Sequence, residues 1–106
     1  MGKTSQVKGK AGELELARLL RSHGYEIERG GCLSFGERPD LMGLPGIRIE
    51  VKRCEKLNLH AAMAQAIRDS ARFGDGAPAV FHRRNNRPWL VTMRLDDWLN
   101  LYKPHD

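Results

Sequence analysis

The stretch that decides the fold is Ile47-Arg48-Ile49-Glu50-Val51-Lys52-Arg53, in which apolar and charged residues alternate without interruption. Successive side chains of a β-strand point to opposite faces, so this alternation predicts a strand with one apolar face and one charged face. The apolar positions are all β-branched, which suits a strand packed on a core. On the charged face we expect Arg48, Glu50 and Lys52 to lie side by side.

A second acidic residue precedes this strand. Pro39-Asp40-Leu41 is followed by the turn Gly43-Leu44-Pro45-Gly46, whose Gly and Pro residues favour a hairpin. Such a hairpin would bring Asp40 beside Glu50 and Lys52. Two carboxylates next to an ammonium group can hold a divalent metal ion and act on the water or phosphate bound to it.

The composition predicts one modest domain over residues 1–106, with residues 1–9 as a mobile basic arm. The chain is 41% hydrophobic, and no apolar run approaches the roughly 20 residues of a membrane span. The N-terminus lacks the apolar segment of a secretory signal, so we expect a cytoplasmic protein with Cys32 and Cys54 as reduced thiols, and a structural disulfide is the less favoured alternative. A formal net charge of +5 favours an anionic partner, and nucleic acid is the commonest.

A helix over about residues 10–23 is predicted before the acidic hairpin, ending at Gly24. Positions 13, 16, 17 and 20 follow the spacing of one buried face, with Glu13 at its start. Glu15 lies on another face, where an ion pair with Arg18 is expected. Alone, Glu13 would be explained by the positive end of the helix dipole. Beside the acidic cluster, we interpret it as a third carboxylate of the site.

The other predicted elements are strands and helices in alternation. They are a strand over 25–28, a helix over about 59–73, a strand over 77–82, a strand over 88–93 and a helix that ends at about 102. The apolar stripe of the second helix is predicted to be Met63, Ala64, Ile67 and Ala71, and the inward face of the last helix Leu95, Trp98, Leu99 and Tyr102. Strands interleaved with helices predict an α/β sandwich around a small mixed sheet.

Basic residues are concentrated in the turn Arg83-Arg84-Asn85-Asn86-Arg87. Its cations could bind phosphate by bidentate contacts or only keep an edge turn soluble, and we favour phosphate binding. The Gly-rich segment 29–37 could follow a DNA backbone or be a plain connector. The residues that we expect to contact DNA are Lys8, Lys10, Arg29, Arg48, Arg53, Arg83, Arg84 and Arg87.

Pro39-Asp40, nine intervening residues and Glu50-Val51-Lys52 resemble the signature of the PD-(D/E)xK nucleases. Further similarities, to archaeal-type Holliday-junction resolvases and related small phage nucleases, are Gly12-Glu13, Gly24-Tyr25, Arg72-Phe73-Gly74 and Ala77-Pro78. The resemblance covers roughly residues 8–93. It implies a restriction-endonuclease-like three-layer sandwich of the α/β class, with a central mixed sheet and flanking helices.

The resemblance also implies a metal-dependent endonuclease that hydrolyses phosphodiester bonds of branched or four-way junction DNA. By position, Glu13, Asp40 and Glu50 match the family's carboxylates, which bind Mg²⁺, with Mn²⁺ as a substitute. Lys52 matches the Lys that assists the attacking water or stabilises the phosphate. Gln65 resembles a Gln that some branches use near the site, although an exposed helical Gln is usually a solvent residue. A phage nuclease would work in the host cytoplasm.

Two other functions stay open: a nuclease of the same fold that nicks or degrades linear DNA, and a non-catalytic nucleic-acid-binding module with structural acids. We also expect a symmetric homodimer, because a junction needs two strands cut at related positions. The surfaces that could form it are the last helix, with Trp98 and Tyr102, and the outer face of the last hairpin, with Trp89. These aromatic residues could instead only complete a thin core.

Overall fold

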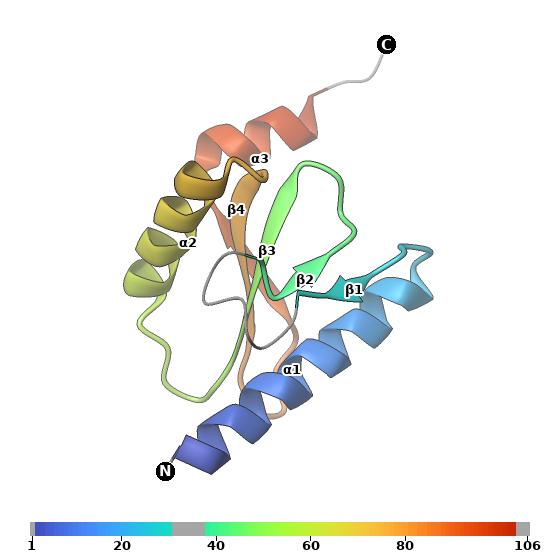
Figure 1. Cartoon of the computed structure of the whole chain (residues 1–106), viewed down its shortest axis with the longest axis vertical. Coiled ribbons are helices and arrows are strands. Elements are labelled where there is room, and N and C mark those ends of the chain that lie inside the picture. The colour runs from blue at the N-terminus through green and yellow to red at the C-terminus, as the bar shows by residue number, and fades with distance from the viewer. Residues whose placement is uncertain (1, 31–37, 104–106) are drawn as a thin grey trace.

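The computed structural model describes residues 2–30 and 38–103, and for residues 2–8 it describes the backbone alone. Within these ranges the chain forms a five-stranded mixed sheet with helices on both faces (Figure 1). In chain order the elements are α1 (Gly2–Ser22), β1 (Glu28–Arg29), β2 (Leu41–Met42), β3 (Ile47–Arg53), α2 (Leu59–Phe73), β4 (Ala77–Arg83), β5 (Leu90–Met93) and α3 (Leu95–Tyr102). The predicted fold class is confirmed.

The sheet is built around β3, and the strands follow one another in space in chain order. β2 joins β3 as an antiparallel hairpin through the turn 43–46, in which Gly43 and Gly46 have positive φ angles of 132° and 81°. β4 runs parallel to β3, with Ile47 opposite Ala77 and Arg53 opposite Arg83. Parallel neighbours need a crossover connection, which α2 supplies.

Two helices cover opposite faces of the sheet (Figure 1). On one face α1 packs against β3, where Ala17 and Ile49 belong to the larger core cluster. On the other face Ala66 of α2 packs on Val80 of β4. Since helices lie on both faces of β3, its charged residues are buried or half-buried rather than fully exposed.

The bounds of α2 agree with the prediction because both of its ends carry strong local signals. The side chain of Asn58 accepts a hydrogen bond from the N–H of Ala61 at 3.0 Å, and Gly74 adopts the left-handed conformation after the last turn. The predicted apolar stripe is wrong by one position. Ala62 and Ala66 are buried, whereas the stripe predicted from position 63 has exposed members at 64 and 71.

α1 begins at Gly2 rather than near residue 10, so the backbone predicted to form an arm is helical. The helix approaches β3 closely at Gly12, where a Cβ atom would lie 2.5 Å from the Cβ of Arg53. A glycine at this position therefore allows the backbone of α1 to approach β3 closely. The predicted strand over 25–28 is wrong at its start, since Tyr25 is exposed and β1 contains only Glu28 and Arg29.

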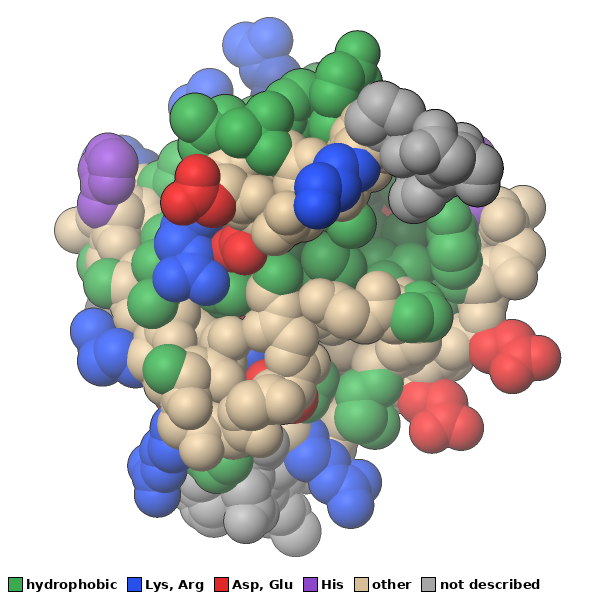
Figure 2. Space-filling model, turned by 90° about the horizontal axis from the view of Figure 1, so that it is seen from above, with side chains coloured by type: hydrophobic (Ala, Val, Ile, Leu, Met, Phe, Trp, Pro, Cys, Tyr) green, Lys and Arg blue, Asp and Glu red, His purple; other side chains and the backbone are tan. Residues whose placement is uncertain are grey.

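α3 differs most from the prediction. The residues expected to face inward are all exposed: Leu95, Trp98, Leu99 and Tyr102. α3 has no buried residue, and Trp98 stacks on Tyr102 with ring centroids 4.9 Å apart. Figure 2 looks down on the end of the molecule near α3 and shows hydrophobic side chains at its surface. No helix in the described ranges is both long and apolar enough to span a membrane.

Candidate active site

Asp40 is anchored to β3 on both sides of Glu50. Its backbone N–H donates to the carbonyl of Ile49 at 3.1 Å, and its Oδ2 accepts from the N–H of Val51 at 2.7 Å. The short hairpin therefore brings the carboxylates of Asp40 and Glu50 together.

The pKa of Glu50 shows that its carboxylate lies close to the carboxylate of Asp40. Burial raises the pKa of Glu50 to about 7, and the negative charge of Asp40 adds to the rise. A hydrogen bond of 2.9 Å from Nε of Arg48 acts in the opposite direction without cancelling it. Two half-buried carboxylates that repel each other favour the binding of a cation between them.

Arg48 holds Glu50 in position from within the protein. Its guanidinium donates to both Glu50 and Asp75 and lies 5.5 Å from the ring centroid of Phe73. The sequence predicts that Arg48 lies on the charged face of this strand and contacts DNA. The structure instead buries it completely, because α2 covers this face, and a side chain with no exposed surface cannot reach a phosphate. No sequence pattern singled out Asp75, which follows the end of α2.

Lys52 lies two residues beyond Glu50 on the same face of β3, opposite His82 of β4. Its half-buried side chain makes no hydrogen bond or ion pair with any residue that the structure describes. Its ammonium group is therefore available to a ligand beside the acids. Gln65 is exposed on α2, and the described chain shows no contact between it and the acidic pair.

Glu13 lies within electrostatic reach of Asp40 but has a different partner. Its Oε1 accepts from Nε and Nη2 of Arg29, at 3.2 and 3.0 Å. Burial and then the charge of Asp40 raise the pKa of Glu13, while Arg29 lowers it. Among residues 9–30 and 38–103, no three His, Cys, Asp or Glu side chains converge closely enough to hold a metal ion. The site is thus a carboxylate pair, with the Glu13–Arg29 ion pair beside it.

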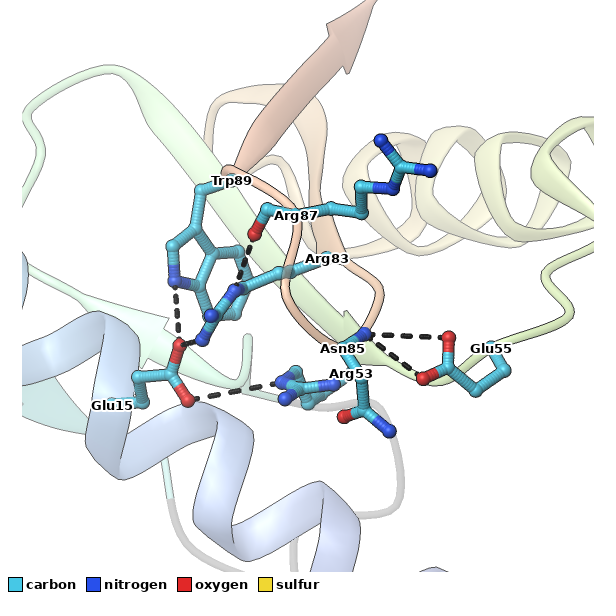
Figure 3. A network of polar contacts seen from close by, with 7 residues as sticks. All are labelled: Glu15, Arg53, Glu55, Arg83, Asn85, Arg87 and Trp89. Atoms are coloured by element: carbon cyan, nitrogen blue, oxygen red, sulfur yellow. Dashed lines mark hydrogen bonds and ion pairs between the residues drawn. The ribbon is translucent and has the colours of Figure 1, made fainter.

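Two of the arginines predicted to contact DNA, Arg53 and Arg83, form ion pairs with Glu15 (Figure 3). Glu15 pairs with Arg83 and, at 3.7 Å, with Arg53, and its Oε1 accepts from Nε1 of Trp89 at 3.0 Å. The expected local pair of Glu15 with Arg18 is therefore wrong. Glu15 ties α1 to the hairpin of β4 and β5, and Trp89 faces this contact rather than open solvent.

The other predicted DNA contacts differ in accessibility. Arg84 and Arg87 lie exposed at the tip of the hairpin, and Lys10 is exposed on α1. The side chain of Lys8 and the segment 31–37, which includes Cys32, lie outside what the structure describes. The described cysteine, Cys54, is a free thiol.

Comparison with known proteins places this arrangement on a known fold. No family model matches the sequence, and no curated protein matches it. Among solved structures, one match is Hjc, a Holliday junction resolvase from the archaeal hyperthermophile Archaeoglobus fulgidus. The match has a TM-score of 0.61 and 23% sequence identity, and it covers 81% of this chain and 72% of that chain. The protein therefore shares the α/β sandwich fold of that resolvase.

Proposed function

We propose that the protein is a metal-dependent DNA endonuclease of the PD-(D/E)xK type, with branched DNA and above all four-way junctions as its substrate. One observation carries the proposal: Asp40 and Glu50 meet in a half-buried pair with the available ammonium of Lys52 beside them. The fold shared with a junction resolvase supports this choice of substrate class.

Asp40 and Glu50 would hold Mg²⁺, or Mn²⁺ in its place, because hard cations prefer carboxylate oxygens. When bound, the ion supplies an activated water and relieves charge at the phosphate. Lys52 would place its positive charge against the scissile phosphate, where negative charge increases in the transition state. Arg48 keeps Glu50 oriented, and Glu13 keeps Arg29 at the edge of the site.

We also propose that two copies associate through α3 to form a two-fold dimer. The exposed hydrophobic residues of α3 form a surface that a partner would be expected to cover: Leu95, Trp98, Leu99, Leu101 and Tyr102. A two-fold dimer presents two sites to a junction of matching symmetry. Arg84 and Arg87 on each copy would contribute phosphate contacts.

The test is cleavage of a labelled four-way junction beside a linear duplex of the same arm sequence, with Mg²⁺ or with EDTA. We expect Mg²⁺-dependent cleavage of the junction and a loss of at least about 100-fold in Asp40→Asn. Junction binding should survive in this variant, since phosphate contacts supply most of the affinity. Glu26→Gln, which removes an exposed carboxylate outside the site and outside α3, is the control and should cleave normally.

Three outcomes would contradict the proposal. Cleavage by Asp40→Asn at the wild-type rate would show that Asp40 is not part of the active site. Equal cleavage of linear and junction DNA would favour a nuclease for linear DNA. Tight binding without any cleavage by the wild type would favour a nucleic-acid-binding module.

A further inference from the structure

Beyond the C-terminal end of β3, a hollow of about 960 Å³ opens between residues 54–59 and the tip of the β4–β5 hairpin. We call it the hairpin hollow. Its volume lies within the roughly 300–1,000 Å³ of sites that bind small molecules. His82 lines the hollow and lies opposite Lys52 on the neighbouring strand. The hollow therefore begins beside the lysine of the candidate active site.

The lining of the hairpin hollow combines apolar surface with cations. Leu57, Pro88 and Leu90 line it, and the side chain of Leu90 is 55% exposed. Arg84 and Arg87 also line it, and neither side chain makes a hydrogen bond or ion pair within the described chain. In Figure 3 the side chain of Arg87 extends away from the Glu15 contacts. This combination suits a ligand with one flat apolar part and one anionic part.

The lining also contains one carboxylate and one imidazole ring. The carboxylate of Glu55 accepts hydrogen bonds from the backbone N–H of Asn85 at 2.9 and 3.3 Å (Figure 3), and the cations Lys56, Arg84 and Arg87 of the lining outnumber it. Burial lowers the pKa of His82, whose Nε2 lies 2.9 Å from Oγ1 of Thr92. A neutral imidazole ring can stack on a nucleobase.

We propose that the hairpin hollow receives an unpaired nucleotide of the DNA strand that passes through the candidate active site. Aliphatic side chains and a neutral ring suit the base, and the arginines suit its flanking phosphates. Cys54 lies four residues beyond Glu50, which is about 13 Å along a strand. That span corresponds to about four stacked nucleotides, or fewer when the strand is extended.

This inference rests on the proposed function in that it takes DNA as the ligand. It adds that the protein distinguishes DNA with an unpaired base near the cut from an uninterrupted duplex. An apolar segment of a partner protein would also cover Leu57 and Leu90. The unpaired arginines favour the polyanion.

The test measures binding in EDTA, so that it does not depend on cleavage. The probes are a continuous duplex and duplexes with a single-nucleotide bulge, in which the fluorescent adenine analogue 2-aminopurine is the unpaired base at successive positions. Wild-type protein should bind the bulged DNA at least about tenfold more tightly than the duplex and change the fluorescence at one or two positions.

Leu90→Glu should remove this preference and the fluorescence change, while it keeps the affinity for continuous duplex within about threefold. Leu19→Glu makes the same exchange at an exposed Leu of α1, outside the hollow, and should behave as the wild type. Arg87→Gln should also lose the preference, and it provides the test if Leu90→Glu does not fold.

Several results would overturn the inference. These are equal binding of bulged and continuous DNA by the wild type, a wild-type preference in both hollow variants, or the same loss in Leu19→Glu. Binding of an apolar peptide in place of the unpaired base would do so as well. A positive result in EDTA together with no cleavage of the four-way junction would refute the proposed function and leave this inference standing.

Discussion

The exchange Glu50→Gln should stabilise the metal-free protein while it abolishes cleavage. Burial and the charge of Asp40 raise the pKa of Glu50 from 4.5 to about 7, in spite of the hydrogen bond from Arg48. The ionised carboxylate is therefore less stable in the folded protein than in the unfolded chain. Gln keeps the shape and removes the charge, and its amide oxygen can still accept from Arg48.

The size of the effect follows from the pKa. One pKa unit corresponds to about 1.4 kcal/mol, so the rise of the Glu50 pKa to about 7 amounts to about 3 kcal/mol at alkaline pH. Between pH 4.5 and 7 the folded state keeps a proton that the unfolded chain has released, so wild-type stability falls as the pH rises through this window. In Glu50→Gln the contribution of Glu50 to this fall should be absent.

The measurement is urea unfolding in EDTA, followed by tryptophan fluorescence across the pH range from acid to alkaline. The advantage of Glu50→Gln should be about 3 kcal/mol above the raised pKa and close to zero below the ordinary one. Glu26→Gln, at an exposed position, is the control and should change stability little at any pH. Added Mg²⁺ should raise the midpoint of the wild type and leave that of Glu50→Gln unchanged.

Two results would refute this reasoning. One is a Glu50→Gln protein that is less stable than the wild type at alkaline pH. That result would mean that the ion pair with Arg48 outweighs burial and the repulsion from Asp40. The other is an advantage that does not change with pH, which would assign the effect to packing rather than to charge.

Two further predictions concern the packing of α1 and the surface of α3. Gly12→Ala should lower the free energy of unfolding by about 1–3 kcal/mol, because its Cβ would clash with that of Arg53. Gly9→Ala, where nothing lies within 4 Å, should raise it by up to about 1 kcal/mol. Thermal unfolding of both variants checks this pair, and equal effects would contradict it. Trp98→Glu should convert a dimer into monomers in light scattering, and a dimer that persists would exclude α3 as the interface.

Local signals explain why the central part of the fold could be predicted. The turn between Asp40 and β3 closes over few residues, so its Gly and Pro residues were enough to indicate the hairpin. The caps Asn58 and Gly74 act within one helical turn and indicated both ends of α2. The start of α1 carries no such signal, and the helix extends well beyond its apolar stripe.

The candidate site could be predicted only in part. Asp40 and Glu50 meet because one hairpin joins them. The sequence indicated the position of Glu13 but not its ion pair with Arg29, because Glu13 lies in α1 and Arg29 in β1. Gln65 was suggested by its place at the edge of the helix and by resemblance, and the described chain shows it exposed.

The sequence by itself determined which residues of β3 share a face, because a strand alternates regardless of what surrounds it. Only the tertiary structure decided which faces are covered. It buried Arg48 against Asp75, 27 residues away, and it joined Glu15 to Arg83, 68 residues away. It also left α3 exposed in spite of its apolar pattern. Such contacts depend on where whole helices pack, and no short-range pattern encodes that.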